Sequence, residues 1–213
     1  MMECRLVLFI LILFETIVSC DSKQREVGNG CDVWVDSVSG LLRSGDICMR
    51  RGTGIASHVV VHCGGKSEDF SHCGIVVKEA DGNIYVCHAV PDEGESPDDS
   101  DRVRLVPISD FYGKGKAVRG AVFRVACSDS IAGAAALAAK EKWRLNVAFD
   151  HAYKWDDTTR LYCTQLVAMA YMRYGVDLVE TRCRSLNVPG FCGDYVFPSD
   201  IVRSRLVEMM AEY

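Results

Sequence analysis

Residues 70–77, FSHCGIVV, form a short apolar run with a histidine near its start. A run of this kind predicts a buried strand, with His72 at its mouth. A second run, NIYVCHAV at residues 83–90, follows the turn-forming residues ADG and contains His88. Together the two runs predict a β-hairpin that carries both histidines.

The register of this hairpin decides whether the two histidines can meet. If residues 80–82 form a three-residue loop with Gly82 in the left-handed conformation, His72 and His88 lie on the same face as diagonal neighbours. Their Cα atoms are then about 7–8 Å apart, close enough for the rings to hydrogen-bond. A two-residue Asp-Gly turn would shift the count by one and place the histidines on opposite faces.

The remaining segments suggest strands first and helices last. Strand patterns recur at 45–50, 101–108 and 117–125, and the acidic stretch PDEGESPDDSD at 91–101 is typical of a solvated loop. Helices are expected at 128–145 with Ser128 or Asp129 as the cap, at 162–175 ending at Gly175, and at 198–210 with Ser199 or Asp200 near the cap. This order predicts an α+β fold, with an antiparallel sheet and segregated helices.

The first 20 residues have the features of an export signal. Arg5 precedes an apolar run at 6–14 that is too short to span a bilayer, and IVSC, ending at Cys20, resembles the lipobox of bacterial lipoproteins. We expect a signal peptide at 1–20, a polar leash and N-terminal extension at 21–38, and one domain at 39–213. A lipid on Cys20 would anchor the protein at the periplasmic or surface side of the cell envelope, whereas plain secretion or an uncleaved apolar start are the alternatives.

Composition narrows the range of partners. The net charge of the 213 residues is −5, so the chain lacks the excess of positive charge that is typical of nucleic-acid-binding proteins. Of the 11 cysteines, only Cys183 and Cys192, in the loop-like segment CRSLNVPGFC, are placed for a surface disulfide. The oligomeric state stays open.

Cys163 is the candidate nucleophile. It falls in the first turn of the predicted helix 162–175, where unpaired N–H groups and the helix dipole favour a thiolate. A nucleophilic cysteine also needs a base, and the base needs an orienting partner. The histidine pair could supply both, whereas a cysteine buried near a helix start merely as a core residue is the competing interpretation.

Two further histidines raise the question of a metal site. His58 and His62 lie four apart in HVVVHC, a spacing that binds zinc on a helix. The valine run favours a strand instead, which would separate the two residues by about 13 Å. We therefore expect no metal and no cofactor.

The two histidine strands and the cysteine helix resemble the motifs of a known family. SHCGIVV and CHAV, followed much later by LYCTQLVAMAY, resemble the circularly permuted, YiiX-like branch of the NlpC-type papain-like cysteine peptidases and amidases, in which the histidine strand precedes the cysteine helix. LRSGDICMRRG, FDHAYKWDDTTRLYC and VFPSDIVRS also match segments of that family. The resemblance covers about residues 40–205 and implies that the domain at 39–213 has a permuted papain-like fold.

The resemblance also implies roles for the candidate residues. Cys163 becomes the nucleophile, His72 the general base and acid, and His88 the residue that orients His72, although permuted relatives often place glutamate at this third position. The implied enzyme is a hydrolase that cleaves an amide through a thioester, on cell-wall peptides or N-acyl substrates, with backbone N–H groups at the helix start as an oxyanion hole. A lipid-acting acyl hydrolase or acyltransferase and a non-catalytic binding module are the alternatives.

Overall fold

The computed structural model describes residues 30–213, apart from 65–69, 95, 97–98, 180–183 and 189–190. The chain divides into two compact units, residues 1–30 and 31–213, and the account below concerns the second. The predicted lipidation of Cys20 and the Cys183–Cys192 bridge fall on residues or side chains outside this described part. The boundaries expected for a signal, a leash and a domain therefore stay predictions.

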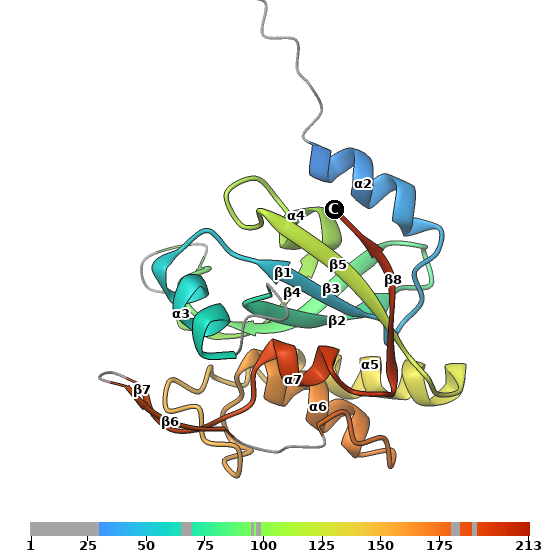
Figure 1. The fold of residues 1–213 in the computed structure, drawn as a ribbon. Coiled ribbons are helices and arrows are strands. Elements are labelled where there is room, and N and C mark those ends of the chain that lie inside the picture. Colours follow the sequence, from blue (N-terminus) through green and yellow to red (C-terminus); the bar gives the residue numbers. More distant parts are fainter. Residues whose placement is uncertain (1–29, 65–69, 95, 97–98, 180–183, 189–190) are drawn as a thin grey trace, which may run out of the picture. The chain divides into compact units, whose positions relative to one another are not determined.

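A six-stranded antiparallel sheet forms the centre of the fold, in the order β4-β3-β2-β1-β5-β8 (Figure 1). Its strands are β1 (Ile47–Arg51), β2 (His72–Lys78), β3 (Ile84–Val90), β4 (Arg102–Pro107), β5 (Arg119–Val125) and β8 (Val207–Glu212). A separate pair consists of β6 (Arg184–Val188) and β7 (Phe191–Tyr195). Neighbouring strands of both sheets pair antiparallel, as predicted.

Helices cover both faces of the sheet. They are α2 (Gly30–Ser39), α3 (Ile55–Gly64), α4 (Ile108–Phe111), α5 (Asp129–Arg144), α6 (Cys163–Met172) and α7 (Pro198–Val202). In Figure 1, α5 and α6 lie below the sheet, and α2 and α4 lie above it. Because side chains alternate along each strand, β1 sends Ile47 and Met49 into the cluster shared with α5 and α6, and Cys48 into the cluster shared with α2 and α4.

The predicted hairpin register is confirmed. The N–H of Glu79 donates to the carbonyl of Asn83 at 2.9 Å, and Gly82 adopts a φ of +88°. Ile75 pairs with Cys87, which places His72 and His88 on one face. The loop at 80–82 therefore has three residues, and its glycine supplies the left-handed conformation that such a loop requires.

Two of the three predicted helices are confirmed closely. Helix α5 is capped by Ser128, whose hydroxyl accepts the N–H of Ile131 at 3.3 Å. Helix α6 gives way to a turn in which Gly175 has a φ of +80°. The side-chain oxygen of Gln165, at the third position of α6, accepts the N–H of Tyr162 at 3.4 Å, which fixes where this helix begins.

Three local predictions are wrong. The HVVVHC run forms helix α3 rather than a strand, because tertiary contacts override the strand preference of valine: Val61 is buried, and the carbonyl of Gly64 accepts a hydrogen bond from Ser199 in α7. Residues 198–210 are not one helix, since α7 ends at Val202 and the following residues pair with β5 as β8. The loop expected at 183–192 contains strand β6 and the start of β7.

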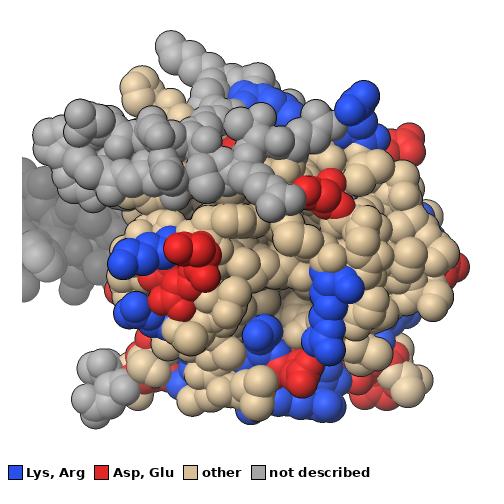
Figure 2. Space-filling view, turned by 90° about the horizontal axis from the view of Figure 1, so that it is seen from below, with Lys and Arg blue, Asp and Glu red and all other residues tan. Residues whose placement is uncertain are grey.

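The surface carries charges of both signs. Figure 2 shows the face seen from below Figure 1, where acidic and basic side chains are interspersed among uncharged ones. None of the described helices combines the length and hydropathy needed to cross a membrane.

Candidate active site

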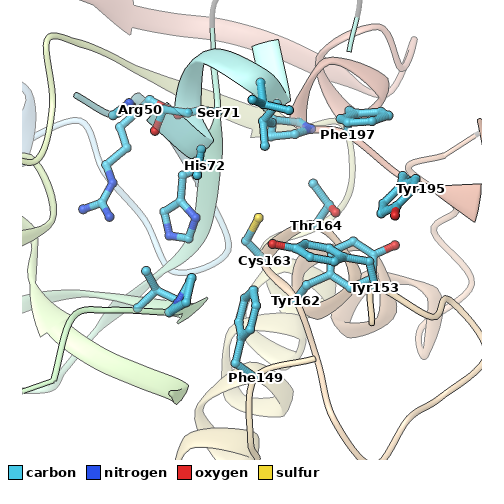
Figure 3. Close-up of a pocket in the computed structure, with 18 of the residues that line it drawn as sticks. Arg50, Ser71, His72, Phe149, Tyr153, Tyr162, Cys163, Thr164, Tyr195 and Phe197 are labelled. Carbon is cyan, nitrogen blue, oxygen red and sulfur yellow. Dashed lines mark hydrogen bonds between the residues drawn. The ribbon is translucent and has the colours of Figure 1, made fainter. Parts of the chain in front are cut away.

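A cavity of about 220 Å³ opens where α3, the start of β2 and the start of α6 meet (Figure 3). Cys163 and His72 both line it, together with Arg50, Phe149, Tyr153 and Phe197. The structure thus brings the predicted nucleophile and the predicted base to one cavity, although 91 positions separate them in the sequence (163 minus 72). His88 lies behind His72 rather than at the cavity wall.

The sulfur of Cys163 lies in a group of hydrogen-bond donors. Cys163 is the first residue of α6 and is partly exposed. Hydrogen bonding from the Cys73 side chain lowers the pKa of the Cys163 thiol, burial opposes this, and the backbone N–H groups of Cys73, Thr164 and Cys163 itself lower it further. The net direction is downward from the ordinary value of a thiol, so the thiolate is favoured, as the helix-start argument predicts.

The two histidines form a hydrogen-bonded pair. Nε2 of His72 lies 2.8 Å from Nδ1 of His88, and the rings meet edge to face. His88 is fully buried, and Phe111 packs against both rings. Since His72 uses Nε2 for this bond, its Nδ1 is the ring nitrogen left for the cavity.

Both imidazoles are held neutral. Burial lowers the pKa of His72 well below its usual value, and the charge of Arg50 and then the neighbouring His88 lower it further. Burial also lowers the pKa of His88, followed by the charges of Arg50, Lys116 and Arg104. A neutral His72 can accept a proton, which a general base must do.

His72 and Cys163 face one another across the cavity (Figure 3), but no hydrogen bond joins the ring to the sulfur in the described part of the chain. Cys73, the residue after His72 in β2, is instead the group that most lowers the pKa of the Cys163 thiol. Catalytic hydrogen bonds are often long before substrate binds and shorten in the complex. A small rotation of either side chain is the movement this geometry requires.

Arg50 is a cavity residue that the sequence analysis missed. It pairs with His72 across the β1–β2 ladder, its guanidinium donates to the carbonyl of Phe111 at 2.7 Å, and it lies 4.6 Å from the centre of that ring. Glu93 forms an ion pair with Arg50 and a second one with Lys116 at 3.1 Å. Glu93 thereby balances the positive charge of Arg50, which limits how far this charge lowers the pKa of the two histidines.

The acidic stretch 91–101 is therefore more than a solvated loop. Besides Glu93, it contributes Asp99, which pairs with Arg102 at 2.6 Å and Arg104 at 2.9 Å on β4. Its first residues, 91–93, line the cavity. The charge pattern alone did not indicate the pairing of Glu93, because Arg50 lies 43 residues earlier in the chain, on β1.

Tyr153 is a second cavity residue that the sequence analysis did not single out. Its backbone has a φ of +52°, which is unusual for a residue other than glycine. Asp150, fully buried, accepts the N–H groups of Ala152 at 2.9 Å and Lys154 at 2.6 Å and so holds this turn. The Tyr153 ring then packs against those of Tyr162 and Tyr195.

His58 and His62 were expected to lie on a strand, too far apart to share a metal ion, but they lie on helix α3. Both are exposed on α3, where a spacing of four residues places them on one face. Nδ1 of His58 lies 3.1 Å from a guanidinium nitrogen of Arg51. Within the described residues, no group of three or more His, Cys, Asp or Glu side chains could hold a metal ion.

A histidine-bearing antiparallel sheet followed by a helix that begins with cysteine defines a papain-like fold in permuted order. A family model described as permuted papain-like amidase enzymes, the YaeF/YiiX or C92 family, matches residues 42–185, and the chain belongs to this family. The resemblance drawn from the sequence and the predicted fold class are thus confirmed.

A solved structure shows the same fold. YiiX from Escherichia coli O157:H7, described as a metalloprotein of DUF1105, superposes with a TM-score of 0.64 at 19% identity, over 80% of this chain and 97% of that one. Comparison with curated proteins gives no match.

Proposed function

We propose that this protein is a cysteine hydrolase that cleaves an amide bond through a thioester, with Cys163 as nucleophile. The family is one of papain-like amidases, which supports the general class of reaction. The observation that carries the proposal is that a thiol with a lowered pKa and His72, which is hydrogen-bonded to His88, open onto one cavity.

The reaction we propose begins when the Cys163 sulfur attacks the substrate carbonyl and its proton passes to His72. Nδ1 of His72 then gives this proton to the leaving amine, and a thioester remains on the enzyme. His72 next takes a proton from water, which attacks the thioester, so that the carboxylic acid leaves and the thiol is restored. His88, hydrogen-bonded at 2.8 Å, holds the ring of His72 so that Nδ1 faces the sulfur.

The oxyanion formed in each step needs donors at the helix start. The backbone N–H groups of Cys163 and Thr164 lower the pKa of the Cys163 thiol, so they already stabilise negative charge at this position. Groups so placed at the N-terminus of a helix are suited to the developing negative charge. We propose that they supply the oxyanion hole.

For the substrate, we propose a cell-wall peptide or an N-acyl compound. A lipid-acting acyl hydrolase or acyltransferase is the second candidate, and one observation favours it: much of the cavity wall is apolar, including Val59 and Val60 of α3 with Phe149 and Phe197. An apolar wall suits an acyl chain or an apolar side chain next to the scissile carbonyl. Hydrolysis of matched amide and ester substrates of increasing acyl length distinguishes the two candidates.

Labelling with iodoacetamide tests the catalytic interpretation against a non-catalytic binding module. Cys163 should be alkylated first near neutral pH, and Cys163→Ala should abolish hydrolysis of every substrate. Cys63 is the internal control, because it lines the same cavity but sits late in α3 rather than at a helix start. If Cys163 reacts no faster than Cys63, the thiolate argument fails and the binding module is the better interpretation.

We route no step through a metal ion. The relative YiiX is described as a metalloprotein, but the described residues here offer no cluster of three or more suitable donors. Structural and catalytic zinc sites need three or four protein ligands. Treatment with a chelator is therefore expected to leave hydrolysis unchanged.

We also propose that the chain is exported and anchored in the cell envelope by a lipid on Cys20. The support is the sequence of residues 1–20, namely an apolar run that ends in a lipobox-like cysteine. In fractionated cells, Cys20→Ala should move the protein out of the membrane fraction. Retention of this variant in that fraction would contradict the lipid anchor.

A further inference from the structure

We infer that Phe111 is a positioning residue, whose ring holds the imidazole of His72 with Nδ1 toward the Cys163 sulfur. This inference rests on the proposed roles of His72 and Cys163, and it adds a residue that acts on the reaction through His72. Phe111 is the last residue of the short helix α4, is fully buried and is not among the residues that line the cavity. Its effect on the reaction must therefore pass through its neighbours.

The ring of Phe111 contacts both histidines. It stacks on the His72 ring at a centroid distance of 5.7 Å and an angle of 30°, and it meets the His88 ring edge to face at 5.2 Å and 84°. The hydrogen bond of 2.8 Å between Nε2 of His72 and Nδ1 of His88 fixes one atom of the His72 ring. The terminal torsion of a histidine has only broad preferences of its own. The flat face of Phe111 restricts this torsion, so the hydrogen bond and the stacked ring together determine where Nδ1 points.

Arg50 in turn holds Phe111 at two points. Its guanidinium donates to the Phe111 carbonyl at 2.7 Å and lies 4.6 Å from the centre of the same ring. A guanidinium suits this double contact, because it is planar, stacks on an aromatic face and donates from several nitrogens. An ion pair with Glu93 anchors Arg50, whose side chain is only 5% exposed. In Figure 3 the guanidinium lies on the side of His72 away from Cys163, so this support acts from behind the imidazole.

The strands place these groups on the face of the sheet that α4 covers. Cys48 on β1 and Val76 on β2 belong to the core cluster of that face. Since side chains alternate along a strand, Arg50 and His72 point to the same face, and the two residues pair across the ladder. Cys163 packs against the cluster of the other face. His72 therefore reaches the sulfur only at the mouth of β2, where the orientation of its ring decides whether Nδ1 faces the sulfur.

Small errors in this orientation have large effects on proton transfer. The accepting nitrogen must come within about 2.6–3.2 Å of the atom that gives up the proton, and a misplacement of about 1 Å can lower the rate about 100-fold. The competing interpretation is that Phe111 merely fills the core, since its ring also packs edge to face on Tyr112 at 4.9 Å. Both interpretations predict a loss of stability when the ring is removed, but only positioning predicts a change at His72.

Two variants remove the support in different ways. Phe111→Leu keeps an apolar side chain but removes the flat ring. Arg50→Lys keeps the positive charge beside the histidines but loses the planar fork that holds the Phe111 ring and carbonyl together. Phe123→Leu is the matched control, because Phe123 is also buried and its ring packs against Phe70 at 6.0 Å in the cluster of the other face.

The experiment follows the proton between the two imidazoles by NMR of the full-length protein with isotope-labelled histidine. This proton lies in a hydrogen bond of 2.8 Å that involves the fully buried His88. It should therefore exchange slowly with water in the wild type, and its loss in His88→Gln assigns it. We expect exchange at least tenfold faster in Phe111→Leu and in Arg50→Lys, and unchanged exchange in Phe123→Leu. Thermal unfolding shows whether each variant folds.

Hydrolysis measured in parallel tests the consequence for the reaction. Phe111→Leu should lower kcat at least tenfold and leave KM within twofold, because Phe111 does not line the cavity. Phe123→Leu should change neither constant by more than twofold.

A folded Phe111→Leu that keeps the slow exchange, or whose kcat falls no further than that of Phe123→Leu, would overturn the inference. If Phe111→Leu does not fold, Arg50→Lys leaves the ring in place and gives the exchange rate and kcat instead. The exchange rates do not depend on turnover. A wild type without hydrolase activity would therefore overturn the proposed function, while the exchange rates would still decide whether Phe111 holds His72.

Discussion

Replacing Gly74 by alanine should separate the two histidines. Gly74 lies on β2 opposite His88, and an added Cβ would meet Cys87 O at 2.9 Å and the Cβ of His88 at 3.0 Å, with the Cγ1 of Val86 at only 2.5 Å. The valine side chain can turn aside, but the carbonyl belongs to the backbone of β3. That strand must therefore move away from β2, and it carries His88 away from His72.

The expected cost has two parts. Overpacking of a closely packed site typically costs about 1–3 kcal/mol. Weakening the hydrogen bond between the rings, now 2.8 Å long, adds about 0.5–1.5 kcal/mol. We expect Gly74→Ala to lower the free energy of unfolding by about 1.5–4.5 kcal/mol, which is less than the total of about 5–15 kcal/mol typical of a domain. Most molecules therefore stay folded, while hydrolysis falls by at least tenfold.

Urea unfolding followed by circular dichroism measures the first effect, and substrate turnover the second. Gly133→Ala is the matched control, because its added Cβ meets nothing within 4 Å in α5. Gly133→Ala should stabilise α5 by about 1 kcal/mol, because alanine is the better helix former, and should leave turnover unchanged. If Gly74→Ala is as stable as the wild type, the packing argument is refuted. If it is destabilised but keeps full turnover, the role of His88 in orienting His72 is refuted.

Three further predictions concern the surroundings of the site. Because burial lowers the pKa of His88, the unfolded chain binds a proton below about pH 6.5 that the folded chain does not, so stability decreases as the pH is lowered below this value, by up to about 1.4 kcal/mol per pH unit. In urea unfolding at a series of pH values, His88→Gln should reduce this slope, and an unchanged slope would contradict the prediction. Asp150→Ala leaves two N–H groups without their acceptor, so we expect the free energy of unfolding, measured by thermal unfolding, to fall by about 2–5 kcal/mol. The turn that carries Tyr153 should loosen as well, which raises KM. An unchanged KM would contradict the role of Asp150 in positioning Tyr153. Ser128→Ala removes the cap of α5 and should lower the free energy of unfolding by about 1 kcal/mol without affecting turnover. Ser130→Ala, which removes a hydroxyl that does not cap the helix, is the neutral comparison.

The hairpin and the nucleophile helix could be predicted because local chemistry determines them. Gly82 supplies the left-handed conformation, and this fixes the register and hence the shared face of the two histidines. Likewise, a strongly apolar helix that gives way to Gly175 is readable from residues close together in the chain. The permuted fold followed from the order of these two motifs, and the family match confirms it.

The errors share a different physical origin, since distant contacts decided each of them. The valines of α3 prefer strands, but the helix is held by α7 through Ser199, which lies 135 residues from its partner Gly64. Residues 207–212 have a pattern that suits a helix as well as a strand, and the free edge of β5 selects the strand. Glu93 could be assigned to Arg50 only after β1 and the loop that follows β3 were placed side by side.

The donors around the Cys163 sulfur come from β2 and from the first turn of α6, so they converge only in the native chain. An unfolded molecule has an ordinary thiol at this position, and unfolding should slow its alkylation. Cys48 and Cys87 are fully buried and should behave in the opposite way, since unfolding exposes them. The ratio of label at Cys163 to label at these two cysteines therefore measures the population of native molecules directly, even in a crude extract and without any known substrate.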